Sequence, residues 1–142
     1  SQSDLALADF EKGIEVDPKN RSTYKARAVL YKFFDKNYGL ALVDHTKVIE
    51  LKPNDGKSYE ERGTFYRNQL KQYDLALSDY TKAIELSPKS SDYYASRASL
   101  YREKKQSDLA LADYTTAIEL SPRTPRYYLP VPLFITSKNN LT

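Results

Sequence analysis

The stretch Leu109-Ala-Leu-Ala-Asp-Tyr-Thr-Thr-Ala-Ile-Glu-Leu-Ser-Pro122 decides the fold, because related copies of it recur along the chain. The other copies begin at Leu5, Leu40 and Leu75 and end at Pro18, Pro53 and Pro88. Successive prolines of this set are therefore 35, 35 and 34 residues apart. A period near 34 residues is typical of helical repeat proteins. The sequence predicts an all-α solenoid whose architecture suits holding other proteins better than catalysis.

A second periodic segment precedes each of the last three copies. It reads Tyr24-x-x-Arg27-Ala28-x-x-Tyr31, Tyr59-x-x-Arg62-Gly63-x-x-Tyr66 and Tyr94-x-x-Arg97-Ala98-x-x-Tyr101. Large residues three and four apart, with a small residue beside them, predict one buried helical stripe. We name this segment helix A and the Leu-Ala-Leu segment helix B. Proline ends each helix B, because it cannot continue the hydrogen-bond ladder.

The order aromatic-x-x-x-small-x-x-Tyr, Ala-x-x-x-aromatic, Pro resembles the tetratricopeptide repeat. The resemblance implies a right-handed superhelix of antiparallel helix pairs. It covers one domain, residues 1–124, with a half repeat at 4–20 and full repeats at 21–55, 56–90 and 91–124. Tyrosine replaces the family's tryptophan, and Arg27, Arg62 and Arg97 replace its leucine. The two longer repeats carry an extra residue, which we expect between the helices near Lys36 and Lys71.

Composition argues against several function classes. The 142 residues include no cysteine and one histidine, and the net charge is +3. We therefore predict no enzyme activity, no cofactor, no metal site and no preference for nucleic acid, whose binding a steep salt dependence would reveal. No apolar run reaches the roughly 18 residues of a membrane span, so we expect no membrane insertion. The composition does not indicate a cellular compartment, so the cytoplasm is taken as the default location. Lacking methionine, the chain is expected to begin inside a longer protein or to be processed.

The aromatic residues obey the repeat. Eleven of the 13 tyrosines occupy equivalent helix positions, which predicts packing and not base stacking. His45 stands where the other helix B segments have Phe10, Tyr80 and Tyr114. We interpret it as a histidine that fills an aromatic position.

Two charged columns accompany the aromatic positions. Helix A carries Arg27, Arg62 and Arg97, and helix B carries Asp9, Asp44, Asp79 and Asp113. Charges that recur beside buried positions predict ion pairs between packed helices. Arg27 is expected to pair with Asp9 or Asp44, Arg62 with Asp44 or Asp79, and Arg97 with Asp79 or Asp113. Removing one partner of a partly buried pair is expected to cost about 3 kcal/mol.

The remaining face of helix A is the predicted binding groove, because the resemblance implies a concave surface lined by this helix. The predicted groove residues are Lys25, Val29, Lys32, Lys57, Glu60, Thr64, Arg67, Asp92, Ser99 and Arg102, and Phe33 lies on the same face. An extended acidic or mixed peptide is the expected ligand class.

One subfamily binds the C-terminal carboxylate of chaperones with a defined set of lysine, asparagine and arginine. Only Lys25 matches that set. Val29, Glu61, Asp92 and Ser96 stand at its other positions, two of them acidic where the carboxylate needs cations. We therefore do not expect a chaperone-tail clamp.

The end of the chain departs from the repeat. Tyr128 has the expected aromatic position, but Pro130 and Pro132 forbid a regular helix there, so residues 125–142 are predicted to form a non-helical tail. The apolar segment Leu129–Ile135 has three open interpretations: a cap over the last helix pair, a contact with a second copy of the chain, or a loose tail. The second makes self-association through uncapped ends an alternative function, with a homo-oligomer as the partner.

Overall fold

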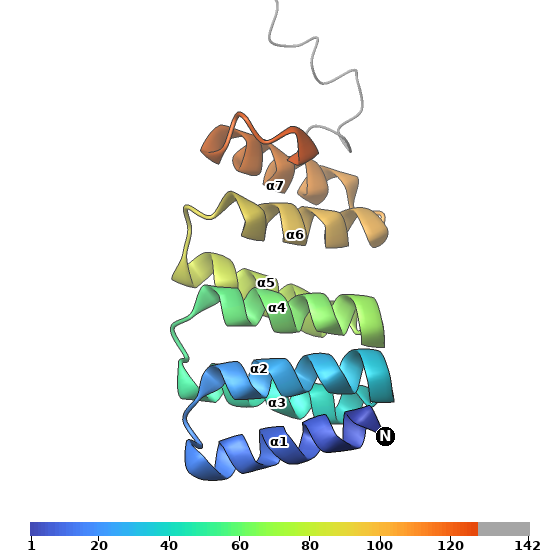
Figure 1. Cartoon of the computed structure of the whole chain (residues 1–142). Helices are drawn as coiled ribbons and strands as arrows, with labels where there is room; N and C mark the ends of the chain where they lie inside the picture. Colours follow the sequence, from blue (N-terminus) through green and yellow to red (C-terminus); the bar gives the residue numbers. More distant parts are fainter. Residues whose placement is uncertain (128–142) are drawn as a thin grey trace, which may run out of the picture. The chain divides into compact units, whose positions relative to one another are not determined.

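The computed structural model describes residues 1–127, and every regular element within them is helical (Figure 1). The elements are α1 (Gln2–Val16), α2 (Arg21–Leu30), η1 (Tyr31–Asp35), α3 (Tyr38–Leu51), α4 (Gly56–Phe65), η2 (Tyr66–Leu70), α5 (Tyr73–Leu86), α6 (Ser91–Glu103), α7 (Ser107–Leu120) and η3 (Pro125–Tyr127). The predicted all-α fold class is thereby confirmed. Within residues 1–127, no helix is both long and apolar enough to cross a bilayer.

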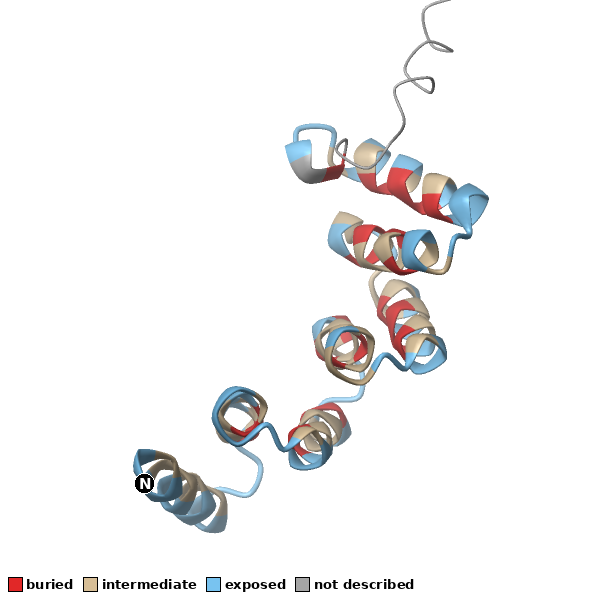
Figure 2. Ribbon diagram, turned by 90° about the vertical axis from the view of Figure 1, so that its right-hand side faces the viewer, coloured by how far each residue is buried: buried red, intermediate tan, exposed pale blue. Residues whose placement is uncertain are grey.

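The helices form two compact units. Unit 1 comprises Ser1–Leu86 and unit 2 begins at Ser87. The most extensive contacts in unit 1 are those of α2 with α3 and of α4 with α5, and in unit 2 those of α6 with α7. Buried residues lie on the sides of these helices that face their pair partners (Figure 2). Each helix A therefore packs on the helix B that follows it.

Small residues allow the paired helices to approach closely. Ala41, Ala76 and Ala83 of helix B segments are 0% exposed. Asn20 and Asn37 begin α2 and α3 by accepting hydrogen bonds from the backbone N–H groups of Ser22 and Leu40, as N-cap residues do. The buried alanines of helix B therefore allow one tightly packed interface in each helix pair.

The extra residue of the two longer repeats lies in helix A and not between the helices. The last turns of α2 and α4 continue as π-helices, η1 and η2, whereas α6 ends at Glu103 without such a turn. A π-helical turn accommodates one inserted residue without breaking the helix. This position corrects the expectation of a longer connection near Lys36 and Lys71.

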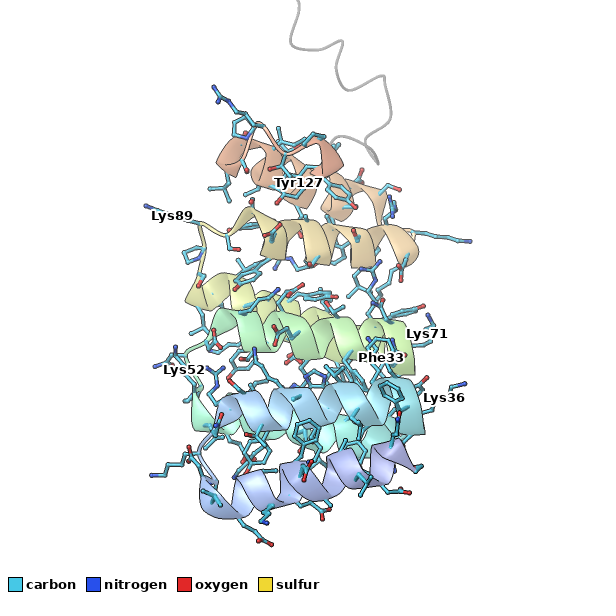
Figure 3. The ribbon with its side chains drawn as sticks, viewed as in Figure 1. Phe33, Lys36, Lys52, Lys71, Lys89 and Tyr127 are labelled. Carbon is cyan, nitrogen blue, oxygen red and sulfur yellow. The ribbon has the colours of Figure 1, made fainter. Side chains whose placement is uncertain are left out.

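A lysine in the left-handed region follows each helix A. Lys36, Lys71 and Lys105 have φ angles of 50°, 55° and 58°, and Figure 3 labels the first two. Side chains with a Cβ are disfavoured in this region, which glycine adopts freely. The turn geometry, and not the lysine side chain, therefore dictates this backbone conformation.

Replacing Lys71 with glycine is expected to raise the free energy of unfolding by about 0.5–1 kcal/mol, because the strain of the left-handed residue is removed. Urea denaturation of the full chain measures the change. Lys71→Ala keeps the Cβ and serves as the control. A gain of equal size for alanine would contradict this explanation.

Tyr127 closes the described part of the chain. Its ring is 2% exposed and packs in the α6–α7 core with Ala95, Tyr114 and Ala117 (Figure 3). Its hydroxyl lies 3.0 Å from Ser91 Oγ and donates to Asp92 Oδ1 at 2.7 Å. The sequence had placed Tyr128 in the aromatic position. Tyr128 and the segment Leu129–Ile135 lie outside the described residues.

Candidate functional site

Six of the ten predicted groove residues line one hollow of about 430 Å³ in unit 1. They are Lys25 and Val29 of α2, Lys32 of η1, and Lys57, Glu60 and Thr64 of α4. The remaining walls come from Ala28, Phe33, His45, Glu61 and Phe65. The faces of two successive helix A segments therefore contribute to one concavity, with α3 contributing His45.

The other four predicted groove residues lie elsewhere. Arg67 is in η2, and Asp92, Ser99 and Arg102 are on α6 of unit 2. Two of them hydrogen-bond within unit 2, because Asp92 accepts a bond from the Tyr127 hydroxyl and Ser99 Oγ lies 2.8 Å from the Tyr114 hydroxyl. The hollow is thus a smaller site than the face that the sequence outlined.

Carboxylates neutralise two cations at the rim of the hollow. Lys25 Nζ lies 2.8 Å from Glu61 Oε2, which joins α2 to α4, and Lys57 Nζ lies 2.7 Å from Glu60 Oε2 on the same helix. Lys32 differs, since its ammonium lies 4.6 Å from the centre of the Phe33 ring. Among residues 1–127, Lys32 makes no ion pair with a carboxylate.

His45 is the residue that α3 contributes to the hollow. Its ring stacks at a tilt on Phe65, with the ring centres 5.0 Å apart. Burial lowers the pKa of His45 below its ordinary value of 6.5; Glu61 and Asp44 act in the opposite direction, and Lys32 and Lys25 add to the lowering. The neutral imidazole is therefore the favoured form at pH 7. The repeat pattern predicts His45 only as a residue that fills an aromatic position. The one feature of the sequence that marks it out is that it interrupts the column of Phe10, Tyr80 and Tyr114.

Each arginine of helix A bonds the aspartate of the helix B that follows it. Arg27 donates to both carboxylate oxygens of Asp44 at 2.9 and 2.7 Å. Arg62 donates to Asp79 at 2.8 and 2.8 Å. The equivalent distances from Arg97 to Asp113 are 2.7 and 2.9 Å. These hydrogen bonds raise the pKa of all three guanidinium groups, against the effect of burial.

Tyrosines flank these arginines on their own helices. The Arg62 guanidinium carbon lies 5.9 Å from the ring centre of Tyr59 and 5.8 Å from that of Tyr66. Arg27 and Arg97 are placed in the same way between the tyrosines three residues before and four residues after them. Cation–π contacts thus occupy the position where the tetratricopeptide pattern has leucine. Asp9 of α1 is exposed and is in none of the three pairs.

A second hollow of about 430 Å³ lies over α3, where Leu42, Val43 and Lys47 line it together with the Arg27–Asp44 pair. None of the ten predicted groove residues lines it. Within residues 1–127, no group of acidic residues and histidine is placed to hold a metal ion. The hollow between α2 and α4 is therefore the candidate site.

Two family models agree with this architecture. One tetratricopeptide-repeat model matches residues 56–90 and a second matches residues 79–112. Curated protein sequences yield no match to the chain.

Solved structures are similar to it throughout. A crystal structure of MamA is 22% identical with a TM-score of 0.76, and the alignment covers 96% of this chain and 79% of MamA. A MamA structure from Desulfovibrio magneticus RS-1 is 21% identical with a TM-score of 0.71, covering 85% of this chain and 67% of that one. The first tetratricopeptide domain of Spaghetti (RPAP3), bound to the HSP90 peptide SRMEEVD, is 23% identical with a TM-score of 0.69, covering 87% of this chain and 94% of that one. The helix pairs and their period agree with the two family models, and the chain contains tetratricopeptide repeats, which the models match over residues 56–112.

Proposed function

We propose that the chain is a non-catalytic interaction module that binds an extended segment of a partner protein along the helix A face of unit 1. One observation carries the proposal: six side chains predicted as groove residues converge on one hollow between α2 and α4. A volume of about 430 Å³ lies within the range of roughly 300–1,000 Å³ that is usual for ligand sites. The peptide-bound tetratricopeptide domain of Spaghetti supports the same class of ligand.

The charges of the site support an internal segment of the partner over a chaperone tail. A C-terminal carboxylate needs several unneutralised cations, and Lys25 is already bonded to Glu61 at 2.8 Å. Val29 offers no hydrogen bond at the position where a carboxylate clamp has asparagine. We therefore propose that the ligand enters by its side chains and backbone and not by a terminal carboxylate.

Lys57→Glu is expected to weaken peptide binding by roughly tenfold or more, because it places a like charge against an acidic ligand at the rim. The probe is a set of acidic 12-residue peptides selected from a random displayed library on the full chain. Fluorescence anisotropy of the selected peptides measures their Kd values.

Lys82→Glu is the matched control for this experiment. Lys57 and Lys82 are both exposed, and each bonds a glutamate three residues ahead on its own helix, at 2.7 and 3.2 Å. Only Lys57 lines the hollow. Equal effects of the two reversals, or unchanged Kd values for both, would place peptide binding on another surface.

Self-association is the alternative function, and exposed apolar side chains on α1 favour it. Leu5 and Val16 are 71% and 83% exposed, and α1 contains no buried residue. A second copy could cover this helix as a neighbouring repeat would. Light scattering that gives the monomer mass at every concentration would contradict this alternative.

A further inference from the structure

The first full repeat departs from the second at the hollow. Val29, Phe33 and His45 stand 35 residues before Thr64, Asn68 and Tyr80, respectively. Val29 and Phe33 are apolar where the second repeat has a polar side chain. His45 has a smaller ring than the tyrosine at its equivalent position. All three residues line the same hollow. Because the repeat pattern does not require these three residue types, the difference is specific to the hollow of the first repeat.

In the second repeat, the residues equivalent to His45 and Val29 are hydrogen-bonded to each other. The Tyr80 side chain is 0% exposed, and its hydroxyl lies 3.1 Å from Thr64 Oγ1, which joins helix B to helix A. In unit 2 the Tyr114 hydroxyl lies 2.8 Å from Ser99 Oγ in the same way. His45 has no hydroxyl at this position, and Val29 has no polar side-chain atom with which a hydrogen bond could form. Both residues instead line the hollow.

Apolar side chains form part of the lining of this hollow. Val29 and Phe33 are 52% and 62% exposed, and Phe33 lies at the η1 end of the α2 ribbon (Figure 3). Phe65 below them is 3% exposed and stacks on His45, whose neutral form is favoured. Exposed apolar surface around an uncharged floor gains free energy when another apolar side chain covers it.

The charge at the edge of the hollow indicates what should accompany that side chain. Lys25 and Lys57 are bonded to Glu61 and Glu60, whereas Lys32 lies over the Phe33 ring and makes no ion pair with a carboxylate among the described residues. An ammonium held beside the mouth of an apolar pocket favours an anion in a ligand that enters it. The complementary ligand thus combines an apolar side chain with a nearby carboxylate.

We infer that the hollow over His45 takes one apolar side chain, of the leucine or phenylalanine class, from a segment that also presents a carboxylate to Lys32. The inference rests on the proposed function, since it names the anchor of a peptide bound along helix A. The Val29–Phe33 wall selects for apolar character, His45 leaves room for the side chain, and Lys32 selects for the neighbouring acidic group.

Three small probes test this inference by NMR titration of the full chain, followed through the Val29 methyl and His45 ring signals. N-acetylleucine is expected to bind saturably with a Kd on the order of millimolar. N-acetylalanine keeps the carboxylate and loses most of the apolar group, so it should bind roughly tenfold more weakly or worse. N-acetylleucinamide keeps the side chain and loses the charge, so it should bind more weakly than N-acetylleucine.

Variants test the pocket itself. Val29→Thr combined with His45→Tyr gives the first repeat the chemistry of Thr64 and Tyr80. It is expected to abolish the response to N-acetylleucine, which is followed in this variant through the ring signals of Phe33 and Phe65, because both line the hollow and are retained. Phe33→Asn, a change at an exposed position that the fold does not need, should weaken binding several-fold. Val43→Thr makes the same chemical change as Val29→Thr at a residue that is 60% exposed on α3 outside this hollow, and should change nothing.

Specific outcomes would overturn the inference. They are equal binding of N-acetylalanine and N-acetylleucine, no saturable shift at the Val29 and His45 signals, or full binding by the folded double variant and by Phe33→Asn. The selected 12-residue peptides separate this failure from that of the proposed function. If the peptides bind more weakly to Lys57→Glu but equally well to the double variant, the proposed groove is supported and the proposed apolar anchor is contradicted. If Lys57→Glu has no effect on them, the groove proposal itself falls.

Discussion

Arg62→Met is expected to lower the free energy of unfolding of unit 1 by about 3 kcal/mol. The substitution keeps the apolar stem of the side chain but leaves the buried Asp79 carboxylate without its two charged hydrogen bonds. It also removes the bond to Thr46 Oγ1 at 3.3 Å and the contacts with the rings of Tyr59 and Tyr66. Urea denaturation followed by circular dichroism measures the loss.

Two further variants identify the cause of that loss. Arg62→Met combined with Asp79→Leu removes both charges, and should recover most of the stability, because an apolar pair can replace a buried ion pair at little cost. Lys82→Met breaks the exposed pair with Glu85 and should cost less than about 1 kcal/mol. A double variant as unstable as Arg62→Met alone would mean that packing of the arginine, and not the uncompensated carboxylate, causes the loss.

The repeat period predicts that the arginines and aspartates lie near each other, but not which aspartate pairs with each arginine. A period of 34 or 35 residues placed the arginines and aspartates in register, while two aspartates remained open for each arginine. In the structure the aspartate of the following helix B accepts both hydrogen bonds, as Asp44 does from Arg27. That choice depends on the angle and spacing of two packed helices, which the sequence pattern does not contain.

Features that break the period were harder to predict. The inserted residue was expected in a connection, because loops usually absorb insertions, but η1 and η2 hold it inside the helix. The sequence outlined the helix A side of the hollow, including Val29, but did not predict that His45 of helix B lines it too. The closing ring of unit 2 is Tyr127, which adjoins the tyrosine that the alignment favoured.

Tyr80→Ala is expected to cost about 4 kcal/mol of unfolding free energy, because it empties a position that is fully enclosed. Tyr80 is among the largest side chains that are fully buried. Its ring lies so close to α4 that a Cβ on Gly63 would be 3.0 Å from two of its carbons. No side chain can move far enough to refill that space, since Gly63 contributes only backbone and Ala76 and Ala83 are small.

Tyr80→Phe separates the ring from the hydroxyl in this prediction. It keeps the packing and loses only the hydrogen bond with Thr64, so its expected cost is about 1 kcal/mol. Equilibrium urea denaturation of both variants, at one pH and salt concentration, gives the two values. If phenylalanine costs as much as alanine, the hydrogen bond between α4 and α5 outweighs the packing of the ring. The open space above His45 would then reflect the missing hydrogen bond more than the smaller ring.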